Sequence, residues 1–231
     1  MSLKSSNVFG KSLAYSNFHE RLIINRKRKI LTVINPRTKK IEASWKSRGK
    51  GIKEFKVFGE KDNRIISVTE DGDLILYSLD HGQKRGPVFE LKLSKGEIGT
   101  PISVAVCNKN EYVFVALAVT WKKPKMMVMK LVEDTLIQTA VIDQLIRDTG
   151  FTFTYGCFGY VERHILWVGL SGKENGRVQV YDYDTETREL NRIESMKANH
   201  QESRPKKLHS FGKSFYYTGK NGKLMCMTLI N

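Results

Sequence analysis

A run of positively charged residues near the N-terminus is the part of this sequence whose residue types and spacing point most clearly to chemistry. Between Arg21 and Lys56 there are thirteen Lys or Arg residues and only two acidic residues, Glu42 and Glu54. The chain of 231 residues has a net charge of +15, so most of its excess charge lies in this segment. Clustered cations attract acidic partners, and the attraction weakens as salt is added. The segment therefore predicts binding to an acidic partner.

The charges fall mainly in predicted turns and crossings between strands. In a four-stranded antiparallel unit, the turn between the second and third strands and the crossing to the next unit share one end. We therefore expect a basic surface that contains Arg26, Lys27, Arg28, Lys29, Lys46, Arg48, Lys50 and Lys53. The equivalent turn of the third unit is predicted to extend it with Lys122, Lys123 and Lys125. A solvated face or a nuclear address would have a similar composition.

Residues that could catalyse a reaction form no recognisable constellation. The glycine-rich stretches lack the spacing of a P-loop, and there is no Gly-x-Ser-x-Gly elbow. A glycosidase would need paired carboxylates beside a channel. Here the candidate acids fall at predicted turns and strand ends: Asp71, Asp73, Asp182, Asp184 and Glu186. We predict a protein that is not an enzyme, with no small-molecule substrate and no cofactor.

The cysteines suggest a reducing environment. Cys107, Cys157 and Cys226 are odd in number and far apart, and each lies in an apolar run, so we expect buried, reduced thiols. Their spacing matches no zinc site. The chain shows neither a secretory h-region at its start nor an apolar run long enough to span a membrane. These features predict an intracellular protein, cytoplasmic or nuclear, without membrane insertion.

One phrase returns about every fifty residues and indicates the architecture. A short polar turn separates two alternating apolar runs at Glu70-Asp71-Gly72-Asp73, at Glu174-Asn175-Gly176-Arg177 and at Lys220-Asn221-Gly222-Lys223. Asp-Gly and Asn-Gly pairs between alternating runs are strong hairpin signals, since both residues tolerate positive φ. All-β repeats of this length are typical of propeller blades.

The strands group into five units. We predict one all-β domain over 1–231, a β-propeller of about five four-stranded blades at roughly 9–47, 51–95, 101–143, 150–196 and 205–231. The fifth unit lacks a fourth strand, which residues 3–8 would supply if the ring closes on itself. The alternative is an open or incomplete propeller completed by a partner's strand. Residues 141–149 are predicted to be a connector.

The turn phrases resemble degenerate WD40-like repeats, whose third strand reads Asp-Gly-x-apolar-x-apolar-Trp/Tyr-Asp. The match is best at Glu174 to Asp184, with Tyr181-Asp182 at the Trp-Asp position, and next best at Asp71-Gly72 with Tyr77-Ser78. No Gly-His dipeptide and no literal Trp-Asp occurs. The resemblance implies a propeller that serves as an interaction platform.

Taken together, these patterns predict a non-catalytic scaffold, a subunit of an intracellular multiprotein complex whose basic face docks on an acidic partner. The alternative is an RNA-contacting component of a ribonucleoprotein or ribosome-assembly particle. No base-reading motif is present, so RNA binding would be led by the phosphate backbone and would depend steeply on salt. A protein scaffold would instead depend on apolar rim residues, for which Trp121 and Phe58 are candidates.

Overall fold

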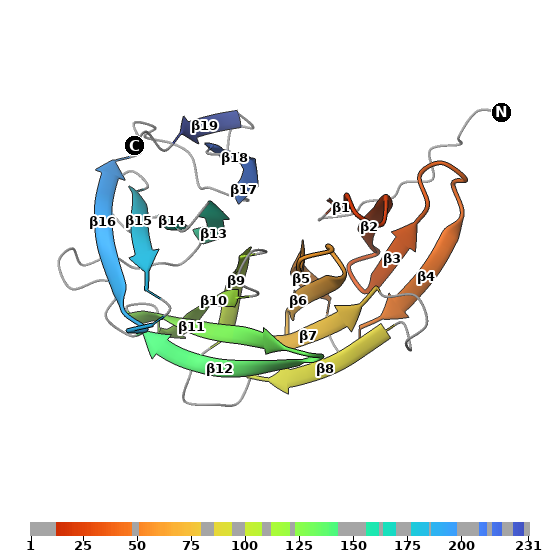
Figure 1. Cartoon of the computed structure of the whole chain (residues 1–231), viewed down its shortest axis with the longest axis horizontal. Helices are drawn as coiled ribbons and strands as arrows, with labels where there is room; N and C mark the ends of the chain where they lie inside the picture. The colour runs from red at the N-terminus through yellow and green to blue at the C-terminus, as the bar shows by residue number, and fades with distance from the viewer. Residues whose placement is uncertain are drawn as a thin grey trace. The chain divides into compact units, whose positions relative to one another are not determined.

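A computed structural model of the chain describes residues 13–47, 51–79, 86–93, 100–107, 112–120, 123–142, 156–161, 164–169, 177–184, 186–197, 208–211, 214–218 and 224–228. These residues form antiparallel sheets joined by turns, with the strands of each sheet in chain order (Figure 1). No helix among them is long and apolar enough to cross a membrane. The chain divides into two compact units, Met1–Lys92 with Glu133–Thr135, and Leu93–Val132 with Leu136–Asn231.

Two four-stranded sheets make up the first unit. The strands of the first sheet are β1 (Leu13–Ser16), β2 (Arg21–Arg26), β3 (Ile30–Ile34) and β4 (Ile41–Lys46). Those of the second sheet are β5 (Ile52–Phe58), β6 (Arg64–Thr69), β7 (Asp73–Ser78) and β8 (Gly86–Lys92).

The second unit contains two further four-stranded sheets and one of three strands. The third sheet has β9 (Thr100–Cys107), β10 (Tyr112–Thr120), β11 (Lys123–Val132) and β12 (Thr135–Ile142). The fourth has β13 (Gly156–Val161), β14 (His164–Gly169), β15 (Arg177–Tyr183) and β16 (Leu190–Lys197). Within the described residues, the fifth has β17 (Leu208–Phe211), β18 (Ser214–Thr218) and β19 (Leu224–Thr228).

The prediction of an all-β fold with four-stranded antiparallel sheets is confirmed, and the predicted blade bounds stay a prediction. The single-domain prediction stays a prediction. Several predicted features lie outside the described residues: the N-terminal strand at 3–8, the connector beyond residue 142, and the turn phrases at 174–176 and 221–222.

Burial within the first unit follows the apolar patterning of the strands. The second sheet's middle strands, β6 and β7, are buried along almost their whole length. The fourth strands, β4 and β8, alternate between exposed and half-buried residues. An outer strand with one wet face shows this alternation, while a middle strand covered on both faces is apolar throughout.

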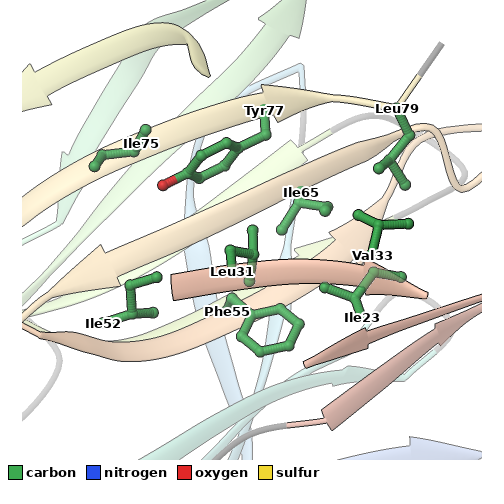
Figure 2. Packing of buried hydrophobic residues seen from close by; sticks show 9 residues of the cluster. All are labelled: Ile23, Leu31, Val33, Ile52, Phe55, Ile65, Ile75, Tyr77 and Leu79. Carbon is green, nitrogen blue, oxygen red and sulfur yellow. The ribbon is translucent and has the colours of Figure 1, made fainter. Parts of the chain in front are cut away.

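The core of the first unit is shared by its two sheets. Figure 2 shows the side chains of Leu31 and Ile23 from the first sheet beside those of Phe55, Ile65 and Tyr77 from the second. Tyr77 holds the Trp position of the repeat phrase, and its ring packs on Trp45 with centroids 5.4 Å apart. The two sheets therefore form one apolar layer, in which the aromatic residue of the repeat joins neighbouring blades.

Polar contacts hold the two sheets together at both ends of this core. At the end of the β1–β2 turn, the Ser16 hydroxyl donates to the Asp62 carbonyl at 3.2 Å, and the Asn17 amide donates to the Asp62 carboxylate at 3.0 Å. At the opposite end, the buried Asn25 side chain donates to the Ile52 carbonyl at 3.0 Å. The β2–β3 turn lies at this second end, so its position is fixed by the packing of both sheets.

Candidate anion-binding site

The β2–β3 turn is a tight hairpin turn made without glycine. Its two central residues, Lys27 and Arg28, have φ angles of 49° and 60°, and the Lys29 amide donates to the Arg26 carbonyl at 3.1 Å. Positive φ at both central positions is the mark of a type I′ turn, which normally takes Asn-Gly. A residue with a Cβ costs about 1–2 kcal/mol in this conformation. The turn therefore holds two cationic side chains in a conformation that ordinary residues avoid.

Hydrogen bonds to the next sheet stabilise this strained turn. The Arg28 carbonyl accepts from the Ile52 amide, and the Lys29 carbonyl accepts from the Ser47 amide at 2.8 Å. These two bonds fasten the turn to the crossing between β4 and β5. The carbonyl groups of the turn thus bond to the rest of the first unit, while the side chains of Lys27, Arg28 and Lys29 are exposed.

Gly51 allows the turn to come this close. A Cβ at residue 51 would lie 2.8 Å from the Arg28 carbonyl oxygen and 3.2 Å from the Arg28 Cβ. The first of these contacts is shorter than real Cβ atoms show, and it is to a backbone atom held by its own hydrogen bond. Only glycine fits here without moving the turn.

Gly51→Ala is expected to destabilise the protein by about 1–3 kcal/mol, because the added methyl group must push the Arg28 carbonyl away from the Ile52 amide. Chemical denaturation measures the change. Arg28→Ala is the matched comparison, since it removes the side chain and keeps the carbonyl. If both variants lost the same stability, close approach at Gly51 would not explain the result.

Six of the predicted basic residues lie together at this end of the first unit. In the sheet register Arg26 is opposite Ile30, which is opposite Lys46, and Lys53 follows the Ile52 that binds the turn. We call these six the basic turn cluster: Arg26, Lys27, Arg28, Lys29, Lys46 and Lys53. Arg26 is half-buried and the other five are exposed.

The remaining predicted site residues are not brought to this cluster by the described structure. Arg48, Lys50 and Lys122 lie outside the described residues. Lys123 and Lys125 belong to β11 in the second unit, so the predicted extension of the basic surface stays a prediction.

Ion pairing differs between the two ends of the first sheet. At the β3–β4 end, Arg37 lies 2.7 Å from the Glu20 carboxylate, and Arg21 lies 2.6 Å from that of Glu42. Within the described part of the chain, Lys27, Arg28, Lys29 and Lys46 form no ion pair. Uncompensated like charges on one turn repel one another, so an acidic partner would relieve this repulsion.

The cluster has an acidic border that the sequence did not reveal. The β6–β7 turn follows the crossing closely: the Glu70 amide donates to the Gly51 carbonyl at 2.7 Å, and the Glu70 carboxyl carbon lies 3.4 Å from the position of a Cβ at residue 51. Desolvation lowers the pKa of the Lys53 ammonium, while the nearby carboxylates of Glu54 and Glu70 act in the opposite direction. Glu70 and Arg28 therefore flank the same glycine from neighbouring blades.

Next to the β6–β7 turn, the carboxylate of Asp73 lies in an environment that disfavours its negative charge. Burial raises the pKa of this carboxyl above its usual 3.8, and Glu90 and Asp71 raise it further, against the opposing effect of Lys92. Its Oδ1 atom is buried and has no hydrogen-bond partner among the described residues.

Asp73→Asn is expected to stabilise the protein at neutral pH. The folded state binds the Asp73 proton more tightly than the unfolded state does, so this group's contribution to stability falls as pH rises from about 3.8 through the raised pKa. The amide stays neutral and avoids that loss. Thermal melts across pH should show the gain at pH 7 and its disappearance in acid. Glu60→Gln, an exposed carboxylate elsewhere, serves as control; an equal effect of both would contradict this account.

The structure corrects two expectations. Cys107 is buried as predicted, but Cys226 is exposed, because it lies on β19, the last strand of a sheet with no further strand in the described residues. Phe58, a candidate rim residue, is 0% exposed and belongs to the core. Trp121, the other candidate, and the Cys157 side chain lie outside the described residues. Within those residues, no group of His, Cys, Asp and Glu has the arrangement of a metal site.

The chain is similar to known proteins in its fold. No protein-family model and no curated protein matches the chain. Among solved structures, the β-propeller domain of Cps50 (Swd1) from Myceliophteria thermophila is similar over 96% of this chain, with a TM-score of 0.70 and 15% sequence identity. The fold is a β-propeller. The chain spans 66% of the length of that domain, and at this identity the likeness is one of fold alone.

Within the propeller, the basic turn cluster occupies the turn between the second and third strands of the first blade, together with the crossing to the second blade. The acidic border occupies the equivalent turn of the second blade. Neighbouring blades of this propeller thus present charges of opposite sign at the same end of the first unit.

Proposed function

We propose that this WD40-like protein is a non-catalytic scaffold subunit of an intracellular multiprotein complex, cytoplasmic or nuclear, and that its basic turn cluster docks on an acidic partner. The observation that carries the proposal is the set of exposed cations, Lys27, Arg28, Lys29 and Lys46, which lack ion pairs within the described residues. The turn that carries three of these cations is also attached by hydrogen bonds to the crossing into the next blade, so its backbone is held in one position.

The contrast within one sheet supports this proposal. At the β3–β4 end Arg21 and Arg37 have carboxylate partners, whereas within the described residues the three cations of the β2–β3 turn form no ion pair. A turn in an unfavourable conformation, retained by hydrogen bonds from its surroundings, is typical of a functional position. A turn whose backbone is already fixed by hydrogen bonds also loses less conformational freedom on binding, which favours affinity.

The second candidate is contact with RNA, since the same exposed cations would suit phosphate groups. RNA contact predicts a steep loss of binding with salt. A protein interface that also buries apolar area predicts a shallower one.

Affinity purification of the tagged protein tests the proposal and separates the two candidates. The purification is done at about 100 and about 500 mM salt, with and without nuclease, on the wild type and on a variant with Lys27, Arg28 and Lys29 changed to Ala. A fixed set of proteins that survives nuclease and is lost from the variant supports the protein scaffold. Loss on nuclease treatment supports RNA contact. A partner set that is the same for the variant and the wild type would refute a docking role for the cluster.

A further inference from the structure

The acidic border of the basic turn cluster has a consequence for partner choice. Glu70 is exposed, and its backbone amide donates to the Gly51 carbonyl. The Arg28 carbonyl lies against the same glycine, so both turns meet at this crossing. Asp71 follows it in the same turn and Asp73 begins β7, whereas Glu54 on the adjoining strand β5 is half-buried and pairs with Lys56 at 3.4 Å. Any ligand that extends from the cluster toward the second blade must therefore pass over carboxylates.

An extended polyanion and a short acidic protein segment would differ in how much negative charge they place next to Glu70. A nucleic-acid strand carries a phosphate at every nucleotide, so a strand long enough to leave the cluster over the second blade brings phosphates against Glu70. A protein segment can place a few carboxylates on the cluster and neutral or basic residues over the border. Proteins often discriminate against a wrong partner by placing like charges opposite each other across the interface, because their repulsion weakens that partner's binding.

Aromatic side chains do not favour a nucleic acid at this end either. Single-stranded nucleic acids are usually held by exposed rings on which bases stack. Trp45, next to Lys46, is half-buried and packs on Tyr77. In the first unit, among side chains that the structure describes, the exposed rings are Tyr15 on β1 and Phe18 in the β1–β2 turn, and both lie toward the other end of the sheet.

We propose that the basic turn cluster recognises a short acidic protein segment, and that Glu70 in the β6–β7 turn excludes extended polyanions such as RNA. This inference rests on the proposed function, because it presumes that the cluster binds an acidic partner. It adds a specificity-determining residue on the neighbouring blade. It also predicts that the partner's acidic run is short and is followed by neutral or basic residues, which complement the border.

Two probes test this inference on the full chain. One is a peptide with a short run of glutamates between neutral flanks, and the other is an oligouridylate charged along its whole length. The peptide carries little beyond its charges, so an affinity of about millimolar is expected, which NMR titration detects. Glu70→Gln is expected to raise oligouridylate affinity about 2–5-fold and Glu70→Lys about tenfold, with peptide affinity unchanged within twofold for Glu70→Gln.

The control is Glu60→Gln, which changes net charge equally at an exposed position in the β5–β6 turn. The inference is supported if only the Glu70 variants gain oligouridylate affinity. It is overturned if the wild type binds oligouridylate more tightly than the peptide, or if Glu70→Gln raises both affinities equally. Failure of both probes to shift the signals of Lys27, Arg28 and Lys29 would instead refute the proposed function itself.

Discussion

Changing Lys27, Arg28 and Lys29 together to alanine is expected to weaken binding of the acidic partner about 10–100-fold at low salt, with little change in stability. Each exposed ion pair contributes up to about 1 kcal/mol, and the three contributions act on one contiguous surface. Alanine keeps the Cβ, so the backbone strain at positive φ stays the same. Titration of the partner against both proteins, together with a thermal melt, measures the two quantities.

The first sheet offers a matched control at its other end. Changing Arg37, Lys39 and Lys40 to alanine also removes three cations from one turn, and Lys39 likewise has a positive φ, of 58°. Since this turn lies at the end of the sheet opposite the basic turn cluster, and Arg37 is already paired with Glu20, this variant is expected to retain binding. Equal weakening by the two triple variants would mean that binding follows net charge, not the basic turn cluster.

Leu31→Ala is expected to cost about 2–5 kcal/mol of folding free energy, the range for a leucine removed from a packed core. The Leu31 side chain is 0% exposed and lies among apolar residues of both sheets of the first unit. The cavity would therefore loosen the contact between blades as well as the first sheet. For a protein of this size the melting temperature should fall by about 5–15 °C.

Leu13→Ala is the matched control for the core variant. The chemical change is the same, but Leu13 on β1 is 60% exposed, so its replacement should change stability by about 0.5 kcal/mol or less. Denaturant titration of both proteins gives the comparison. If Leu13→Ala proved as costly as Leu31→Ala, the shared core would not be the main source of stability in the first unit.

Alternation of apolar residues was enough to predict the strands. The expected four-stranded antiparallel units are present as the first two sheets, β1–β4 and β5–β8. Turn conformation was harder. In the Glu70-Asp71-Gly72 phrase only Gly72 has a positive φ, of 89°, while the tight turn with two positive φ angles occurs at Lys27-Arg28, which carries no Asn or Gly. Tertiary hydrogen bonds to Ile52 and Ser47 decide that conformation, and local sequence does not contain them.

The basic turn cluster was predictable in part because its charges are close in sequence and the order of strands fixes the end at which they lie. Its acidic border was not predictable, because Glu70 reaches Gly51 only through the packing of one blade on the next. The close approach at Gly51 was missed for the same reason. Its only sequence signal was a glycine at a crossing between strands, which is also what an ordinary loop contains.

The most direct test of a docking role for the basic turn cluster is to exchange Lys27-Arg28 for Asn-Gly and to measure melting temperature and partner recovery on the same protein. Asn-Gly suits a type I′ turn and keeps the Arg28 backbone carbonyl position, so relief of strain should stabilise the fold by about 1–2 kcal/mol. We predict a protein that melts higher and recovers less of its acidic partner. A protein that melts higher and still recovers the partner in full would contradict the account.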